Sequence, residues 1–254
     1  MIRKNKLKQL IKDGGFAVGT FVKSNDPAIA EILGFSGLDF IVLDNEHVAM
    51  SRDSMINMIR SADSTDIVPI VRVRENRPVE ILQALDAGAL GVQVPNVDTK
   101  DEAASLIESV KYNPIGKRGF SPTTRAAAFG LMDKKEYVAL SNQETLVVAH
   151  CETTTCMENL DEILTLEYLD VIFIGPMDLS QSLGVMGEAN HPKVVESIEL
   201  IINKVIGAGK AVGIVSSPAQ ADDYIKKGVQ YLLISTDQGM IASAAQKIVA
   251  DIKK

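Results

Sequence analysis

The chain has 254 residues, of which 46% are hydrophobic and 23% charged, so it can bury a sizeable core as two small domains or as one large α/β barrel. Its formal net charge of −7 argues against non-specific nucleic-acid binding, and no run approaches the roughly 18 apolar residues of a membrane span. Two cysteines are too few for a disulfide framework or a zinc cluster, and the basic N-terminal stretch lacks a signal peptide's apolar region, so we expect a cytoplasmic location.

Short apolar segments recur along the whole chain and are predicted to be strands. Most are rich in β-branched residues and apolar on both faces, which is typical of parallel strands covered on two sides. There are eight of them, at residues 16–22, 38–44, 68–73, 90–95, 145–150, 170–175, 210–216 and 230–236.

Amphipathic stretches alternate with these segments and predict helices, for example at 77–88, 191–210 and 218–228. Their closing glycines suit the position after a helix. Eight strand–helix pairs with no linker or composition shift predict one (β/α)8 TIM barrel that spans residues 1–254 as a single domain. A doubly wound open sheet is the alternative, but the chain lacks the Gly-rich first turn that usually accompanies it.

The segment 113–130, "NPIGKRGFSPTTRAAAFG", has neither helical nor strand periodicity. It contains Lys117, Arg118 and Arg125 and no acidic residue, inside an acidic protein. Long loops in compact domains are often binding loops or lids. The segment therefore predicts either a solvated connection or a basic, lid-like loop that contacts an anionic substrate.

Polar residues follow most of the predicted strands, at the end of a barrel where catalysis takes place. Each has a structural explanation as well: Asp178 suits a helix N-cap, and Glu152 can belong to a cap too. Arg72 can serve a structural ion pair, and His47 can be an ordinary loop histidine. The full set is Asp44, Glu46, His47, Arg72, His150, Glu152, Asp178, Ser216, Ser217, Ser235, Thr236 and Asp237.

The set as a whole indicates a metal site. Glu152 and Asp178 follow neighbouring strands, and two carboxylates held close together repel unless a cation or a proton lies between them. Without cysteine or multiple histidine ligands, such a pair suits a hard divalent ion, with Mg²⁺ and Mn²⁺ fitting best. Arg72 would add a fixed positive charge nearby, and His47 a side chain of the type that titrates near neutral pH.

At these residues the chain resembles the HpcH/HpaI class II pyruvate aldolases, which include 4-hydroxy-2-oxoheptanedioate and 2-dehydro-3-deoxyglucarate aldolases. Five blocks carry the resemblance in order: "GLDFIVLDNEH", "VPIVRV", "LQALDAGALGVQVPNVDTKDEA", "HCETTTCMENLDEIL" and "LDVIFIGPMDLSQSLG". The resemblance implies a barrel of the phosphoenolpyruvate/pyruvate-domain type. It also implies reversible cleavage of a 4-hydroxy-2-oxo acid to pyruvate and an aldehyde through a metal-stabilised enolate.

The same resemblance implies roles for individual residues. Glu152 and Asp178 would be the metal ligands, for Mg²⁺ or Mn²⁺ and otherwise Co²⁺ or Zn²⁺, and Arg72 would bind the keto oxygen. His47 would be the acid/base, assisted by Asp44 or by Asp86 of a neighbouring subunit. The substrate-binding residues would be Arg72, His150, Gly175, Met177 and Ser121.

Members of this family usually form homotrimers or homohexamers, so we expect a homo-oligomer in which the C-terminal helix packs on a neighbouring subunit. The small-molecule partners would be a 2-oxo acid and an aldehyde, with no nucleic acid and no membrane. The basic residues of 113–130 suggest an acidic aldehyde as the acceptor.

The chain departs from the family in three places. His150 stands where the family commonly has Gln, and Asn45 replaces a Gly before the acidic–histidine pair. The basic loop retains Arg118 and Arg125, but its interior differs. His150 can hydrogen-bond a metal-bound water, ligate the metal or fill space, and we favour the first. Three alternative functions remain: a Schiff-base aldolase using Lys23, a CoA-ester lyase of the citrate lyase β-subunit type, and a non-catalytic oxo-acid-binding barrel.

Overall fold

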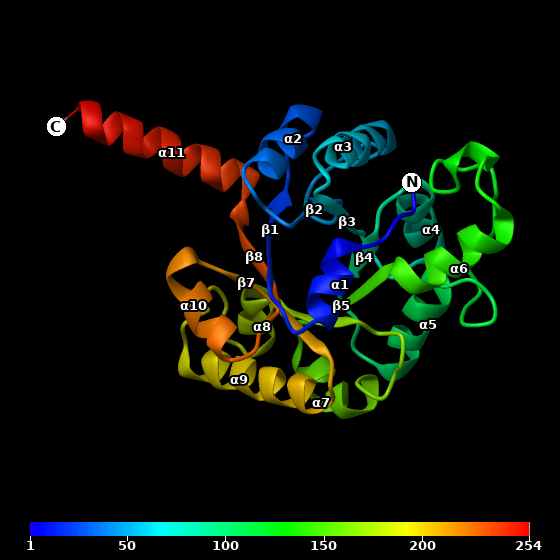
Figure 1. Cartoon of the computed structure of the whole chain (residues 1–254). Helices are drawn as coiled ribbons and strands as arrows, with labels where there is room; N and C mark the ends of the chain where they lie inside the picture. The colour runs from blue at the N-terminus through cyan, green and yellow to red at the C-terminus, as the bar shows by residue number, and fades with distance from the viewer. Residues whose placement is uncertain (254) are drawn as a thin grey trace.

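The computed structural model describes residues 1–253 and contains a closed barrel of eight parallel strands, paired in the order in which they occur along the chain (Figure 1). The predicted fold class is confirmed, and each strand boundary lies within two residues of its prediction. The strands are β1 (Ala17–Val22), β2 (Phe40–Asp44), β3 (Val68–Arg72), β4 (Gly91–Val94), β5 (Leu146–Cys151), β6 (Val171–Ile174), β7 (Ala211–Ser216) and β8 (Tyr231–Thr236).

Helices cover the outside of the barrel, and α1 lies against the end at which the strands begin (Figure 1). Asn5, the N-cap of α1, anchors this helix by donating side-chain hydrogen bonds to the carbonyls of Leu90 and Glu144, both at 3.0 Å. The helices are α1 (Lys6–Lys12), α2 (Pro27–Phe35), α3 (Arg52–Thr65), α4 (Pro78–Asp86), α5 (Lys100–Val110), α6 (Lys134–Glu144), α7 (Thr154–Ile163), α8 (Pro176–Ser182), α9 (Pro192–Gly207), α10 (Pro218–Lys226) and α11 (Asp237–Ile252), with a 3₁₀ turn η1 (Ala128–Gly130).

Alternation along the strands divides the core into two layers. In β2, Phe40 and Val42 belong to the apolar cluster inside the barrel, whereas Ile41 and Leu43 belong to the cluster shared with the surrounding helices. Because side chains alternate with a period of two, the next residue, Asp44, continues the inward-facing series. Arg72 in β3 and His150 in β5 continue the inward-facing series of their own strands in the same way. The alternation therefore points the side chains of Asp44, Arg72 and His150 into the barrel near the strand exits.

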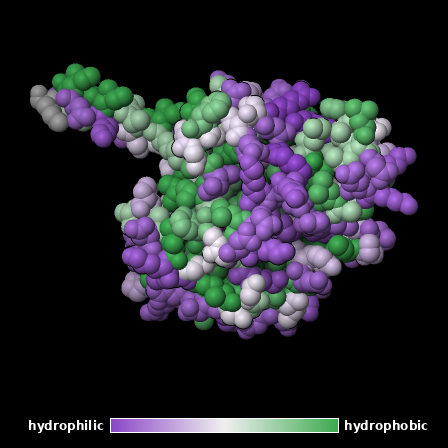
Figure 2. All heavy atoms as spheres, in the orientation of Figure 1, coloured by the Kyte–Doolittle hydropathy of each residue, from purple (hydrophilic) through white to green (hydrophobic). Residues whose placement is uncertain are grey.

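The C-terminal helix α11 projects away from the barrel (Figure 1) and is packed on β1 and β8 only near its start. Asp237 is its only buried residue in the part of the chain that the structure describes. Hydrophobic atoms line one side of the projecting helix (Figure 2), where the exposed apolar residues are Ile241, Ile248, Val249 and Ile252. None of the helices in residues 1–253 is both long and apolar enough to cross a membrane.

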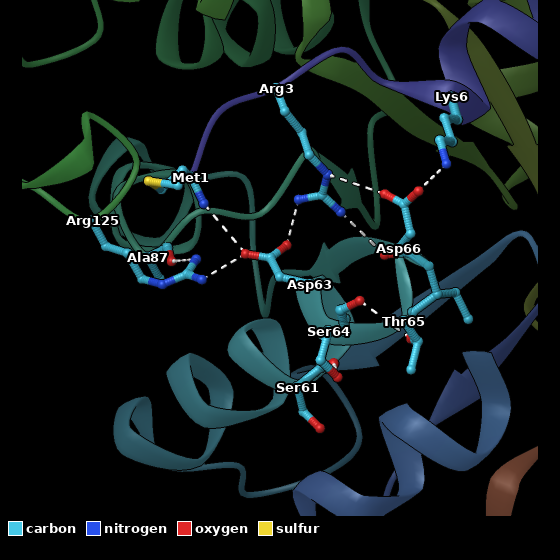
Figure 3. A network of polar contacts seen from close by, with 12 residues as sticks. Met1, Arg3, Lys6, Ser61, Asp63, Ser64, Thr65, Asp66, Ala87 and Arg125 are labelled. Carbon is cyan, nitrogen blue, oxygen red and sulfur yellow. Dashed lines mark hydrogen bonds and ion pairs between the residues drawn. The ribbon is translucent and has the colours of Figure 1, made fainter. Parts of the chain in front are cut away.

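The segment 113–130 is irregular apart from η1, as predicted, and packs at the end of the barrel where the strands begin. Arg118 pairs with Asp86 at the end of α4 at 2.7 Å. Arg125 donates to Asp63 of α3 and to the carbonyl of Ala87, and Arg3 reaches the same Asp63 carboxylate from the N-terminal segment (Figure 3). Helices α3 and α4 both end close to the beginning of the strand that follows them. The segment therefore lies at the end of the barrel opposite to the strand exits.

Candidate active site

The ends of β2 and β3 hold an arginine between two carboxylates. Backbone pairing sets Asp44 beside Arg72. Asp44 accepts two hydrogen bonds from Arg72, from Nε at 3.0 Å and from Nη2 at 2.8 Å, while Glu46 Oε2 lies 2.9 Å from Nη1. The guanidinium also stacks over the ring of Phe21, 4.3 Å from its centroid. Arg72 is therefore a fixed positive charge with its orientation set from three sides.

The pKa values of the two carboxyl groups around Arg72 are shifted in opposite directions, although burial raises both. Burial raises the pKa of a carboxyl group, but the hydrogen bonds and charge of Arg72 outweigh burial at Asp44 and hold its pKa below the usual value. At Glu46 burial wins over the attraction of Arg72, and the negative charge of Glu152 adds to it, so the pKa is raised. The negative charge of Glu152 therefore acts on the pKa of Glu46 across the mouth of the barrel.

His47 lies at the open edge of this cluster. Its side chain is 52% exposed, and its Nε2 lies 3.7 Å from Glu46 Oε2. Asp44 accepts the backbone N–H of His47 at 3.2 Å instead of binding its imidazole. Asp44 therefore fixes the backbone at His47 but does not form an Asp–imidazole pair with it.

Glu152 and Asp178 converge on the space beside Gly175. A Cβ at Gly175 would lie 2.7 Å from Glu152 Oε2 and 3.5 Å from Asp178 Oδ2, so the missing side chain leaves room between the two carboxylates. The N-cap of α8 is Gly175, and Asp178 lies exposed in the helix's first turn without a capping hydrogen bond. The helix-cap explanation for Asp178 is therefore wrong.

The residues present fit a divalent ion with oxygen ligands. Two carboxylates face a common space beside Gly175, and one of them, Asp178, has no protein partner in the described structure. No cluster of three or more His, Cys, Asp or Glu side chains suited to a metal occurs within residues 1–253. Glu152 and Asp178 would thus be the protein ligands of an ion that takes its other ligands from water and substrate, as Mg²⁺ commonly does.

The surroundings of Glu152 keep it ionised. Its Oε2 lies 2.7 Å from His150 Nδ1, and its Oε1 accepts the backbone N–H of Asn96 at 2.9 Å. Asn96 has the left-handed φ of 53°, which Asn adopts more readily than most residues and which turns its amide toward the carboxylate. Burial raises the pKa of Glu152, but His150 and the Asn96 amide more than reverse this and lower it.

His150 is buried inside the barrel with both ring nitrogens occupied. Nδ1 faces Glu152, Nε2 lies 2.8 Å from the amide nitrogen of Gln93, and the ring packs on Phe173. In this arrangement neither nitrogen is free to ligate a metal or to bind a metal-bound water. The contact with Glu152 was not among the roles expected for His150.

The remaining predicted site residues divide between the two ends of the barrel. Met177 is exposed at the start of α8, next to Asp178. Asp86 and Ser121 lie at the opposite end, where Asp86 is paired with Arg118. Within one chain these two do not reach His47, so their predicted roles require a neighbouring copy.

Three residues outside the predicted site contact it directly, namely Glu46, Gln93 and Asn96, and Tyr231 reaches it through Gln93. Glu46 was noted at a strand exit but given no role, and Asn96 was not singled out from the sequence. Gln93 and Tyr231 lie inside strands predicted as core. The available signal was the single amide in "GVQV", since a polar residue at an inward-facing strand position needs a buried partner.

Comparisons with known proteins match most of this chain. The family model described as HpcH/HpaI aldolase/citrate lyase matches residues 17–244. A 5-keto-4-deoxy-D-glucarate aldolase of Shigella boydii is 34% identical over 252 residues, which is 98% of this chain and 97% of the relative. An HpcH/HpaI aldolase/citrate lyase family protein from Burkholderia cenocepacia has a TM-score of 0.94 at 28% identity, covering 99% of this chain and 100% of that structure. The citrate synthase SbnG has a TM-score of 0.89 at 29% identity, covering 97% of each chain.

Proposed function

Because the chain belongs to the HpcH/HpaI aldolase/citrate lyase family, we propose that it is a carbon–carbon lyase that reversibly cleaves a 4-hydroxy-2-oxo acid into pyruvate and an aldehyde. The observation that carries this proposal is the convergence of Glu152 and Asp178 beside Gly175, with Arg72 held at the same mouth. A cation bound by the two carboxylates would supply Lewis-acid stabilisation of negative charge on the keto oxygen of the substrate.

Cleavage begins with removal of a proton from the C4 hydroxyl. His47 is the group we assign to this step, because its ring is exposed at the mouth and histidine accepts a proton near neutral pH. The C3–C4 bond then breaks, the aldehyde leaves, and the bonding electrons form the enolate of pyruvate.

Arg72 stabilises the enolate oxygen as its charge develops. Asp44 and Glu46 occupy only some of the five N–H donors of its guanidinium, which leaves others to face a substrate. Because Arg72 is already oriented, no reorganisation is needed when the charge appears. Protonation of the enolate carbon completes pyruvate. Asp86 and Ser121 of a neighbouring copy are proposed to complete the site beside His47.

The acceptor is proposed to be an acidic aldehyde, on an argument different from the one made from sequence. All three basic residues of 113–130 are engaged with acidic residues of their own chain: Lys117 with Glu108, Arg118 with Asp86 and Arg125 with Asp63. Lys23, at the exit of β1, is less firmly engaged. Its amine lies 3.7 Å from Asp44, a carboxylate that Arg72 already binds at 2.8 Å. The relatives' name describes a dicarboxylate substrate, whose cleavage leaves a carboxylate on the aldehyde, and Lys23 is the cation positioned to receive it.

We also propose that the chain assembles as a trimer or hexamer, with α11 packed on a neighbouring subunit. The exposed apolar side of this helix supports the assembly (Figure 2). Light scattering measures the oligomeric state of the purified protein and of a chain that ends before α11. A monomeric full-length protein would contradict the proposal.

The experiment that tests the function is a pyruvate-release assay with a panel of 4-hydroxy-2-oxo acids and added Mg²⁺, Mn²⁺ or Co²⁺. We expect turnover that EDTA abolishes and that borohydride treatment with substrate leaves unchanged, since a Schiff base on Lys23 is not involved. Cleavage of a malyl-type thioester instead would favour a CoA-ester lyase. Binding of pyruvate without turnover of any substrate would identify a non-catalytic barrel.

A further inference from the structure

A chain of polar side chains crosses the otherwise apolar interior of the barrel. Tyr231 in β8 donates from its hydroxyl to Gln93 Oε1 in β4 at 2.9 Å. Gln93 Nε2 lies 2.8 Å from His150 Nε2 in β5, and His150 Nδ1 lies 2.7 Å from Glu152 Oε2. Tyr231 and Gln93 are fully buried, and His150 is 2% exposed. Polar groups in such an interior persist only when each one is hydrogen-bonded.

With the Gln93 amide oriented as in the structure, the direction of every hydrogen bond among these four side chains follows from their donor and acceptor atoms. The oxygen of a glutamine amide can only accept, so Tyr231 must donate to it, and the nitrogen can only donate, so His150 Nε2 must accept. An imidazole that accepts at Nε2 carries its proton on Nδ1. That proton faces Glu152 Oε2, which as a carboxylate oxygen can only accept. The four groups therefore have one mutually consistent arrangement.

We propose that Tyr231 and Gln93 are positioning residues that hold the proton of His150 on Nδ1, with Nε2 as the acceptor, and thereby fix the direction of the Glu152 carboxylate. His150 holds Oε2 of Glu152 and the Asn96 amide holds Oε1, so the carboxylate cannot rotate, and its remaining lone pairs are available for a cation shared with Asp178. This inference rests on the proposed function only in taking Glu152 as a metal ligand. The tautomer itself follows from the protein's own hydrogen bonds.

The tautomer can be measured without metal or activity by ¹⁵N NMR of the histidine side chains, since the chain contains only three histidines. In the metal-free protein we expect the His150 signals, identified by their loss in His150→Gln, to show a proton on Nδ1 and none on Nε2. A proton on Nε2 would overturn the proposal. The tautomer is read from the unmodified protein, and the His150→Gln variant serves only to assign the signal.

Tyr231→Phe tests the remote end of the chain. The substitution keeps the ring, which stacks on Phe40 with centroids 4.3 Å apart, and removes only the hydroxyl that orients Gln93. We expect His150 to show a mixture of tautomers, because the Gln93 amide can then turn. The matched control is Tyr137→Phe, which removes another buried hydroxyl whose partners, Tyr112 and Arg118, do not contact the four hydrogen-bonded side chains. His150 signals that stay unchanged in Tyr231→Phe, or shift equally in both variants, would contradict the positioning role.

Titration with Mn²⁺ alone extends the test to Glu152. Loss of outer groups that orient a metal ligand commonly weakens metal binding by roughly 10- to 100-fold, and we expect a loss in this range for Tyr231→Phe with none for Tyr137→Phe. Unchanged Mn²⁺ affinity alongside a disturbed tautomer would refute the control of Glu152 by the chain. Absence of Mn²⁺ binding in the unmodified protein would instead refute the metal site of the proposed function. The NMR result would still decide the direction of the hydrogen bonds from Tyr231 to Glu152.

Discussion

Replacement of the buried Lys111 by Met should remove a large part of the protein's stability change between neutral and alkaline pH. Lys111 is 1% exposed at the end of the barrel where the strands begin. Its Nζ donates to the carbonyls of Asn142 and Thr145, at 2.9 and 2.8 Å, and not to a carboxylate. Burial, assisted by the positive charge of Lys8, lowers the pKa of Lys111 to about 7.

The direction of the effect follows from the two pKa values. In the unfolded chain Lys111 has the ordinary pKa of 10.5, so between pH 7 and 10.5 the unfolded state holds a proton that the folded state has lost. The free energy of unfolding therefore rises with pH across this window, by about 1.4 kcal/mol per pH unit and about 5 kcal/mol in all. The stabilisation is fully present above pH 10.5 and is lost as the pH falls to 7.

Urea unfolding at pH 7.5 and pH 9.0 measures the effect. The wild type should gain roughly 2 kcal/mol more than Lys111→Met over this interval, because the variant has no amine to deprotonate. Lys117→Met is the matched control, since Lys117 is exposed and pairs with Glu108 on the surface. Equal changes with pH in the wild type and Lys111→Met would show that the buried amine is not neutral, and the reasoning would fail.

Four further predictions concern the mouth of the barrel. Arg72→Ala should lower the rate of pyruvate release by roughly 10²–10³ with Mn²⁺ affinity nearly intact, and near-normal turnover would refute its role. Asp178→Ala should abolish Mn²⁺ binding in calorimetry while the melting temperature stays close to that of the wild type, because this carboxylate caps no helix; a large loss of stability would point to a structural role instead. Gly175→Ala should weaken Mn²⁺ binding, since the new Cβ would lie 2.7 Å from Glu152 Oε2, and unchanged affinity would mean that the carboxylate is not needed there. Lys23→Met should raise the KM for an acidic aldehyde by about 10-fold, the value of one charged hydrogen bond, but leave that for a neutral aldehyde of equal length unchanged; equal effects on both aldehydes would exclude the proposed contact.

Local sequence patterns predicted the barrel because they report on local structure. The strand 170–175 is apolar on both faces and ends in Gly175-Pro176, so both its existence and its end can be recognised without knowing its neighbours. The irregularity of 113–130 was recognisable for the same reason. Its location was not, because it depends on ion pairs with distant residues, such as Arg125 with Asp63, that no local pattern encodes.

The candidate site was predictable where its residues stand at the ends of strands, and not where they lie inside them. Arg72, Glu152 and Asp178 stand out because parallel strands deliver the residues at their ends to a common edge. Gln93 and Tyr231 do not stand out, since each lies within an apolar strand and acquires a polar role only through a partner more than fifty residues away. Which partner a buried amide finds is a property of the closed barrel.

The groups at the mouth differ in how firmly the protein holds them, and this difference explains how one site can be both rigid and receptive. Arg72 is fixed by Asp44 and Glu46, and both oxygens of Glu152 accept hydrogen bonds. Asp178 alone among the proposed metal-site and enolate-site groups is exposed and without a capping or ion-pair contact. A cation would therefore meet one ligand already oriented and one still free to turn toward it, so the ordering required on binding falls on a single short side chain. Preorganisation of this kind lowers the entropic cost of binding without closing the site to exchange of water and substrate.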